Sequence, residues 1–232
     1  MNFYFPRTPS IVMRFFASYI WRFSAHKKEI YLTFDDGPTP EITDFVLNEL
    51  KKYNAKASFF CIGKNIQKHP DIFKKILLEG HTIGNHTQQH LNGWKTKKTH
   101  YIDNVIACEH AISNTLENIE ASKTHCQHPK LFRPPYGKIK GSQAKELARK
   151  GYKVIMWDVL SADFDTAISN EKCLQNVLEN TKNGSIIVLH DSIKASEKVR
   201  FVLPKILKEF SDKGFVFKAI SFDSVSNARQ VS

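Results

Sequence analysis

Short apolar runs alternate with amphipathic helical patterns from residue 30 onward, and this alternation limits the fold more than any other feature. Seven runs rich in β-branched and aromatic residues predict strands over 30–34, 57–61, 81–85, 131–133, 153–157, 185–189 and 215–220. Helical patterns occupy the intervening stretches 40–53, 70–79, 101–118, 142–150, 169–182 and 196–213. Strands that alternate with helices pair in parallel through right-handed crossovers. The sequence therefore predicts an α/β fold around a parallel sheet.

Two architectures satisfy this pattern, a doubly wound sheet and a (β/α) barrel. No glycine-rich dinucleotide fingerprint follows the first predicted strand, which argues against a nucleotide-binding doubly wound domain. We therefore expect an incomplete barrel of seven strands, similar to a TIM barrel that lacks one strand. The 232 residues suit one such domain, and no linker or repeat divides them.

The chain is basic, with a net charge of +11. Its lysines are spread along the sequence, whereas a nucleic-acid footprint needs clustered basic residues, so we expect no nucleic-acid partner. A basic exterior suits an acidic polymer or an anionic membrane face, and it also favours solubility alone.

The four cysteines are far apart and form no Cys-x-x-Cys pair, which argues against a zinc ribbon or a redox dithiol. Unpaired thiols favour a reducing compartment. A short cluster of His and Cys at 125–128 precedes a proline, and we interpret it as a solvent loop.

An aromatic-rich segment, residues 1–28, precedes the predicted catalytic domain of residues 29–232. Its apolar part, 11–23, is shorter than the roughly 20 residues that span a bilayer. It is a poor signal peptide, because bulky Phe23 lies where a small residue should precede the cleavage site. We favour a helix docked on the domain and expect the cytoplasm as the compartment. Weak contact with a membrane surface through 11–23 and an export signal are the alternatives. No transmembrane segment is expected.

Polar clusters follow the ends of five predicted strands. They are Asp35-Asp36, His86 to His90, Arg133 to Gly137, Asp163-Phe164 and Leu189-His190. In a (β/α) barrel the carboxyl ends of the strands share one rim, and active sites lie on that rim. The sequence therefore predicts that all five clusters contribute to one site.

The adjacent acids Asp35 and Asp36 repel each other, and a divalent cation would offset this by binding one while the other acts as a base. A plain surface turn is the alternative, since Gly and Pro follow. His86 and His90 are four residues apart, so on a helical turn both rings would face one cation. Together with Asp36 they predict a site for one divalent metal. Zinc is the first choice, and cobalt, nickel or manganese would also fit.

Over about residues 29–220 the sequence resembles the polysaccharide deacetylases, the NodB-homology domain of carbohydrate esterase family four. The five motifs of that family occur here in order, as TFDDGP at 33–38, HTQQH at 86–90, RPPYG at 133–137, DF at 163–164 and LH at 189–190. The resemblance implies a distorted seven-stranded (β/α) barrel. It also implies a hydrolase that removes acetyl groups, with a metal, from an acetylated amino-sugar polymer or oligosaccharide.

The resemblance further implies that Asp36, His86 and His90 bind the metal. Asp35 would then be the general base that takes a proton from water, and Arg133 would keep that carboxylate ionised and oriented. These roles agree with the chemistry of the residue types, because a bound cation can bring the pKa of water to about 7.

By the same resemblance, His190 would be the general acid and Asp163 would hold its ring. The backbone amide of Tyr136 would stabilise the oxyanion. The acetyl pocket would be lined by Leu189, Phe164 and Pro135. The family commonly has Trp at the position of Phe164, and we expect this change to alter pocket shape without removing catalysis.

Two other functions are the alternatives, and the residues present argue against the second. The same machinery could act on an O-acetyl ester or a non-sugar amide. A carbohydrate-binding barrel without catalysis would lack Asp35 or His190, and both are present. Among the neighbouring acids, we interpret Asp158 and Asp165 as solvated loop residues and Asp191 as a cap of the next segment.

Overall fold

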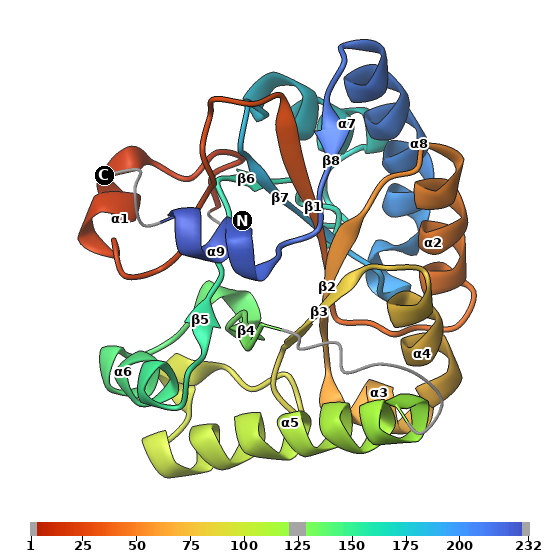
Figure 1. The fold of residues 1–232 in the computed structure, drawn as a ribbon. Coiled ribbons are helices and arrows are strands. Elements are labelled where there is room, and N and C mark those ends of the chain that lie inside the picture. The colour runs from red at the N-terminus through yellow and green to blue at the C-terminus, as the bar shows by residue number, and fades with distance from the viewer. Residues whose placement is uncertain (1–3, 121–128, 229–232) are drawn as a thin grey trace.

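A parallel sheet centred on β1 (Glu29–Asp35) organises the computed structural model, which describes residues 4–120 and 129–228 (Figure 1). The other strands are β2 (Ala57–Cys61), β3 (Thr82–Asn85), β4 (Leu131–Phe132), β5 (Lys153–Val154), β6 (Val159–Leu160), β7 (Ile186–His190) and β8 (Val216–Phe217). Seven strands follow the order β5-β4-β3-β2-β1-β7-β6, all in parallel, and β8 pairs with the start of β1. The sheet curls without closing, since β5 and β6 are its two ends. The predicted α/β fold and incomplete barrel are confirmed.

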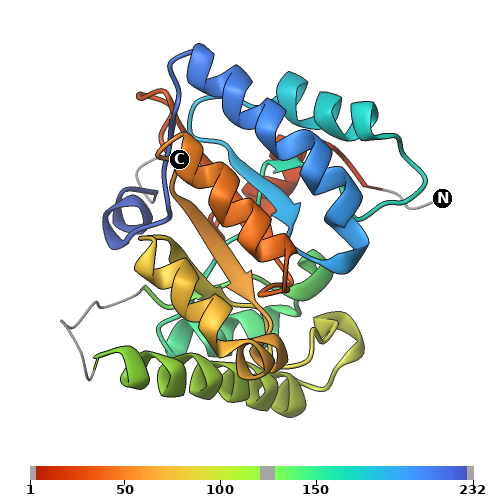
Figure 2. The same cartoon turned by 90° about the vertical axis from the view of Figure 1, so that its right-hand side faces the viewer.

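Helices cover the outer face of the curled sheet (Figure 2). They are α2 (Ile42–Lys52), α3 (Gly63–Lys68), α4 (Pro70–Leu78), α5 (Lys98–Glu120), α6 (Gly141–Arg149), α7 (Asn170–Asn180) and α8 (Ser196–Asp212). Because the central strand is buried along nearly its whole length, β1 is apolar on both faces. This explains the unbroken apolar run from Ile30 to Leu32.

The main hydrophobic core lies between the sheet and the helices, and its buried side chains include Leu32, Phe34, Val46, Leu203 and Phe210. Successive residues of a strand point to opposite faces, so Tyr31 packs on the other side of β1. Phe23 packs there against Tyr31, with ring centroids 4.3 Å apart. The N-terminal segment therefore contributes to the core inside the barrel.

The N-terminal segment lies across the gap between the two ends of the sheet. Arg7 forms an antiparallel bridge with Val159 of β6, and Ile20 forms a parallel bridge with Ile155, just after β5. The Phe23 amide also donates a hydrogen bond to the Gly184 carbonyl, at 2.8 Å. Backbone pairing of this kind joins the segment to the strands that flank the opening. The boundary between residues 1–28 and 29–232 as domains stays a prediction.

The expected helix over 11–23 is wrong in its length, because α1 covers only Ser10–Phe15. Beyond α1 the backbone pairs with the sheet, since the Ile20 amide donates to the Val154 carbonyl and the Met156 amide donates to the Ile20 carbonyl. An isolated helix with few residues gains little from its own hydrogen bonds, so pairing with the sheet edge prevails.

Among the strands and α-helices that the structure describes, β6, α3 and α9 (Phe222–Asn227) were not expected from the sequence. Strand β6 has two residues, too few to show a period, and its pairing with β7 identifies it. Cys61, Cys108 and Cys173 are buried free thiols. Cys126 and the whole stretch 125–128 lie outside the described residues. None of the helices that the structure describes is long and apolar enough to cross a bilayer.

Candidate active site

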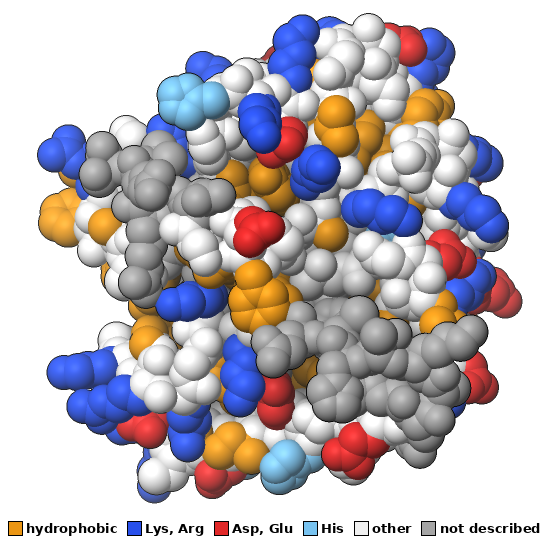
Figure 3. Space-filling view, in the orientation of Figure 1, with side chains coloured by type: hydrophobic (Ala, Val, Ile, Leu, Met, Phe, Trp, Pro, Cys, Tyr) orange, Lys and Arg blue, Asp and Glu red, His pale blue; other side chains and the backbone are white. Residues whose placement is uncertain are grey.

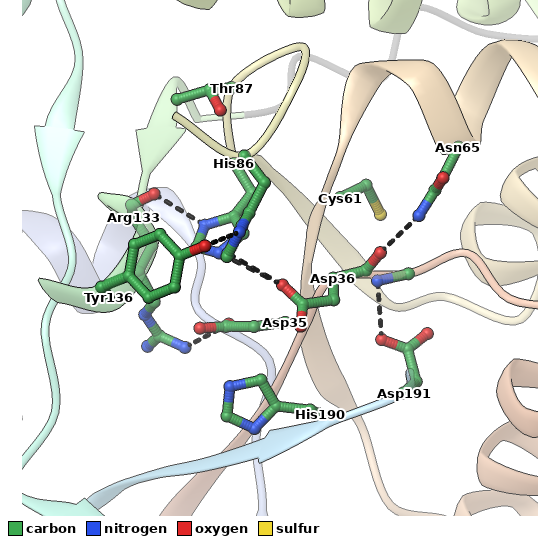
Figure 4. A network of polar contacts seen from close by, with 12 residues as sticks. Asp35, Asp36, Cys61, Asn65, His86, Thr87, Arg133, Tyr136, His190 and Asp191 are labelled. Carbon is green, nitrogen blue, oxygen red and sulfur yellow. Dashed lines mark hydrogen bonds and ion pairs between the residues drawn. The ribbon is translucent and has the colours of Figure 1, made fainter. Parts of the chain in front are cut away.

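The carboxyl ends of the strands carry the polar clusters to one rim, as the sequence predicts (Figure 4). Strand β1 ends at Asp35, and β7 ends at His190. His86 follows β3 and Arg133 follows β4 directly. Asp35 and His190 are partners in the register of β1 and β7, so two of the predicted residues are neighbours across the sheet.

Asp36, His86 and His90 form a compact group that could hold a cation. Their candidate ligand atoms all lie within 4.8 Å of one another. Oδ1 of Asp36 lies 3.6 Å from Nε2 of His86 and 3.2 Å from Nε2 of His90. That oxygen is buried and has no hydrogen-bond partner. A buried carboxylate oxygen facing two imidazole nitrogens fits a divalent metal better than any contact within the group itself.

Neighbouring groups orient both imidazole rings and set the tautomer of His86. Nδ1 of His86 lies 2.7 Å from the Arg133 carbonyl oxygen, which can only accept. The proton of neutral His86 is therefore on Nδ1, and the lone pair of Nε2 faces Asp36. Nδ1 of His90 lies 3.1 Å from the Tyr136 hydroxyl, so its Nε2 is turned the same way. Outer contacts of this kind orient metal-binding histidines.

The charge states also favour cation binding. Burial lowers the pKa of His86 to about 4, so this ring is neutral at pH 7. Burial alone would raise the pKa of Asp36, but His90, His190 and His86 lower it well below its usual range. An ionised carboxylate and a neutral imidazole are the forms that bind a metal.

The segment from His86 to His90 is a loop and not the expected helical turn. Thr87 and His90 have φ values of 65° and 55°, in the left-handed region. The Leu91 amide donates to the Thr87 hydroxyl, and the Gln89 amide donates to the Asn104 side-chain oxygen. The two imidazole centroids are 5.1 Å apart. Side-chain hydrogen bonds replace the helical ladder here and still bring the rings together.

Arg133 and Asp35 form a buried ion pair, with Nη1 2.7 Å from Oδ1. Arg133 is fully buried and also donates to the carbonyls of Ile155 and Met156. Its guanidinium lies 4.1 Å above the Phe60 ring centroid. Burial lowers the pKa of Arg133, and Asp35 opposes that shift. The pair therefore fixes one carboxylate beside the candidate metal group.

His190 and Asp163 form the second pair of the rim. Nδ1 of His190 lies 2.7 Å from Oδ1 of Asp163, and the His190 amide donates to Oδ2 at 2.7 Å. Burial would lower the pKa of His190, but Asp163 outweighs it and raises that pKa to about 10. The ring is thus charged at neutral pH and can donate a proton from Nε2.

The interpretation of Asp191 as a cap of the next segment is wrong, because its side chain points to the turn after β1 instead. Asp191 is fully buried, and it accepts hydrogen bonds from the Gly37 amide at 3.0 Å and from the Thr43 hydroxyl. A Cβ at Gly37 would lie 2.0 Å from Oδ2 of Asp191. Only glycine therefore leaves room for this contact in the turn after Asp36. Burial also raises the pKa of Asp191 to about 7.

The interpretation of Asp158 as a solvated acid is wrong. Asp158 is buried and accepts hydrogen bonds from the Ser185 hydroxyl and the Ile186 amide, which joins the β6 segment to β7. Asp165 is half-buried and accepts a hydrogen bond from the Tyr4 hydroxyl at 2.8 Å. The contacts that bury Asp158 and that join Asp165 to Tyr4 come from residues far away in the chain, so the sequence carries no signal for them.

Of the three expected pocket residues, Phe164 and Pro135 lie beside residues of the rim, whereas the Leu189 side chain lies on the opposite face of β7 from His190. Phe164 contacts His190 edge to face, with centroids 5.3 Å apart. Leu189 precedes His190 on β7 and is fully buried in the main core, and Pro135 is buried beside Tyr136. The Tyr136 side chain itself is 61% exposed at the rim. Their part in binding an acetyl group stays a prediction.

Comparison with known proteins adds independent information. The family described as polysaccharide deacetylase matches residues 23–155. A peptidoglycan N-acetylglucosamine deacetylase of Bacillus cereus is 37% identical over 205 residues, covering 86% of this chain and 70% of that protein. A chitooligosaccharide deacetylase of Azorhizobium caulinodans is 32% identical over 176 residues, covering 76% and 80%. A crystal structure of a peptidoglycan N-acetylglucosamine deacetylase with a bound N-oxidanyl-benzamide superposes with a TM-score of 0.80, at 33% identity over 92% of this chain and 95% of that one.

The incomplete barrel carries a rim of paired acids and histidines with a candidate metal centre, an arrangement that suits a hydrolase. The match over residues 23–155 and the relatives above 30% identity make the assignment specific. The chain belongs to the polysaccharide deacetylase family, the carbohydrate esterases with NodB homology.

Replacement of Arg133 by methionine should leave the Asp35 carboxylate buried without its cation. We expect the free energy of unfolding to fall by about 3–5 kcal/mol, the usual result of removing one partner from a buried pair. Chemical denaturation of both proteins measures this difference. Arg149→Met is the matched control, because that side chain is 64% exposed and its pair with Glu146 is on the surface. Equal losses in the two variants would contradict the importance of the buried pair.

Proposed function

We propose that this chain is a metal-dependent N-deacetylase that acts on N-acetylglucosamine residues of peptidoglycan or of chitooligosaccharides. The observation that carries the proposal is the unpartnered, buried Oδ1 of Asp36 facing His86 and His90. On the same rim lie Asp35, which is ion-paired to Arg133, and the charged imidazole of His190. The relatives named above as peptidoglycan and chitooligosaccharide deacetylases support this substrate class.

Asp36, His86 and His90 would hold one divalent cation, which supplies Lewis-acid activation of water and of the acetamide carbonyl when bound. Zinc is our first choice, because two imidazoles and one carboxylate leave further positions open, as in hydrolytic zinc sites. Cobalt, nickel and manganese fit the same donors less selectively.

Asp35 is proposed as the general base. Its carboxylate is ion-paired to Arg133, and this contact fixes its orientation. The next residue, Asp36, belongs to the candidate metal group, so Asp35 lies directly beside that group. It takes one proton from the attacking water as the new C–O bond forms at the acetyl carbon. The backbone N–H of Tyr136 is proposed to stabilise the oxygen that becomes negative in this step.

His190 is proposed as the general acid for the second half of the reaction. Its Nδ1 is hydrogen-bonded to Asp163, so Nε2 carries the proton that can be given away. That proton passes to the amine nitrogen as the C–N bond breaks, and acetate and a free amino sugar result. Phe164 and Pro135 are proposed to surround the acetyl methyl group, whereas Leu189 supports β7 from the core.

Acetate release from N-acetylglucosamine oligomers and from peptidoglycan tests the proposal, with chelator and with zinc or cobalt restored. Asp35→Asn should keep the metal and lower the rate by about 10²–10⁴, the usual contribution of a general base. His86→Ala should lose metal and rate together. His100→Ala, at an exposed position on α5, is the control and should retain both.

Release that is unaffected by chelator, or by Asp35→Asn, would contradict the proposed mechanism. Ester hydrolysis without any amide hydrolysis would move the assignment to an O-acetyl substrate. Full metal occupancy in His86→Ala would show that another residue completes the metal site.

The alkaline side of the pH–rate profile should report His190. Because Asp163 raises the pKa of His190 from 6.5 to about 10, the ring keeps its proton far above neutral pH. The stability that this pair contributes is full below pH 6.5 and is lost as the pH rises through about 10. Activity should fall in the same upper range.

Asp163→Asn should move the alkaline limb down by about two pH units, since the main stabiliser of the charged ring is gone. The rate profile between pH 6 and 11 measures the shift. Asp223→Asn, at an exposed position of α9, should leave the limb in place. An identical limb in all three proteins would mean that another group is the acid.

We also propose weak contact with an anionic membrane surface through the N-terminal segment. Its exposed apolar side chains include Ile11 at 57% and Phe15 at 78%, four residues apart on α1, with exposed Arg14 between them. Hydrophobic side chains reach the surface at the left edge of Figure 3, where Figure 1 draws α1. Apolar and cationic groups on one short helix fit a lipid surface with negative headgroups. The cytoplasm as compartment stays a prediction.

Sedimentation with vesicles of anionic and of zwitterionic lipid tests this contact. Phe15→Ser should weaken binding to anionic vesicles by about tenfold or more, because burying one aromatic side chain contributes about 1.5–3 kcal/mol. Leu78→Ser is the control, since Leu78 is 75% exposed on a different helix. Equal binding of both variants, or no binding by the unmodified chain, would contradict the proposal.

A further inference from the structure

The first described residues of the N-terminal segment pair with β6 through one antiparallel bridge. The Leu160 amide donates to the Pro6 carbonyl at 2.8 Å, and the Thr8 amide donates to the Asp158 carbonyl at 2.9 Å. Arg7 and Val159 form the antiparallel bridge between these two contacts. The register of this pairing is therefore fixed by hydrogen bonds on both sides of one residue.

This direction carries Tyr4 toward the catalytic rim. In an antiparallel pair, earlier residues of one strand lie beside later residues of the other. Tyr4 precedes Arg7 by three residues, so at about 3.4 Å per residue it lies roughly 10 Å further toward the carboxyl end of β6. The loop that carries Asp163 begins at that end.

Tyr4 makes two contacts with this loop. Its hydroxyl donates a hydrogen bond to Oδ2 of Asp165 at 2.8 Å, and its ring contacts the Phe164 ring edge to face, with centroids 5.8 Å apart. Phe164 in turn contacts the His190 ring at 5.3 Å. The Tyr4 side chain is thus separated from His190, the proposed general acid, by the Phe164 ring alone.

Asp165 connects the Tyr4 contact to the backbone of the loop. Its Oδ1 accepts a hydrogen bond from the Ala167 amide at 3.0 Å, and its own amide donates to the Ala162 carbonyl at 2.9 Å. Ala162 has a φ of 62°, a conformation that an alanine rarely adopts without outside support. The loop that presents Asp163 and Phe164 is therefore held on one side by β7 and on the other by Tyr4.

We propose that Tyr4 is a positioning residue of the active site, which holds the 163–165 loop so that Phe164 stays against His190 and forms one wall of the acetyl pocket. This inference rests on the proposed function, because the pocket is part of it. Nothing in the five motifs includes Tyr4, which is 161 residues away from its partner Asp165.

If Tyr4 holds one wall of the acetyl pocket, its replacement should change the preference for an acetyl over a larger acyl group. In Tyr4→Ala the half-buried Phe164 ring loses its outer neighbour and can move away from His190, which enlarges the pocket. We expect the kcat/KM ratio of N-acetyl to N-propionyl substrate to fall by about fivefold, the value of one aromatic contact of about 1 kcal/mol. The loss should appear mainly in KM and acyl preference, since Asp35 and Arg133 are untouched.

Two further variants separate the ring from the hydroxyl. Tyr4→Phe keeps the ring contact and should recover most of the acetyl preference. Phe5→Ala is the matched control, because Phe5 is the neighbouring aromatic and is 59% exposed. It should behave as the unmodified chain does in every measurement.

Hydrogen exchange of the amides of residues 161–168 gives a readout that does not depend on activity. Tyr4→Ala should speed this exchange, while Phe5→Ala should not, and thermal unfolding shows that each variant is folded. Unchanged exchange and unchanged acyl preference in Tyr4→Ala would overturn the inference. Faster exchange with an unchanged preference would also overturn it, because Tyr4 would then support the loop without shaping the pocket.

The proposed function has its own separate sign of failure. If the unmodified chain releases no acetate from any substrate, the deacetylase proposal fails, while the exchange measurement still decides whether Tyr4 holds the loop. If the unmodified chain is active, the comparison of Tyr4→Ala with Phe5→Ala decides the inference alone.

Discussion

The ion pair between Arg133 and Asp35 is the contact on which the rest of the site depends. Arg133 is fully buried, so its charge needs a partner, and Asp35 provides it at the end of the central strand. The same guanidinium donates to the carbonyls of Ile155 and Met156, which lie beyond β5. The Arg133 side chain therefore joins the end of β1, in the middle of the sheet, to the segment after β5, at one end of the sheet. The carboxylate proposed as the general base is therefore also part of a structural cross-link.

Two histidines of the rim, His190 and His86, have pKa values that are shifted in opposite directions. Asp163 raises the pKa of His190, whereas burial lowers the pKa of His86. One imidazole is therefore charged and another is neutral at the same pH, although both are histidines at strand ends. This difference in charge agrees with the roles proposed for them, His190 as the proton donor and His86 as a metal ligand. Asp36 is the carboxylate that faces both kinds of histidine.

The alternation of strands and helices predicted the parallel sheet, because burial on both faces leaves a clear apolar run in β1. The motif order also placed Asp36, His86 and His90 on one rim, since parallel strands end on the same side. The burial of Asp191 and Asp158 was not predictable, because their partners lie far away in sequence and only tertiary packing brings them close. The loop geometry of 86–90 was missed for a related reason. A four-residue spacing fits a helix, yet Thr87 and His90 adopt positive φ values supported by side-chain hydrogen bonds.

The pairing of the N-terminal segment with β6 has a consequence for synthesis on the ribosome. Tyr4 and its partner Asp165 are 161 residues apart, and Ile20 pairs with Ile155. At about 5–20 residues per second, the early aromatic residues wait roughly 10–30 s before their partners emerge. During that interval Trp21 and Phe23, which are buried in the finished protein, have no sheet to cover them. The nascent chain thus carries an exposed apolar segment that a chaperone can bind until the barrel is nearly complete.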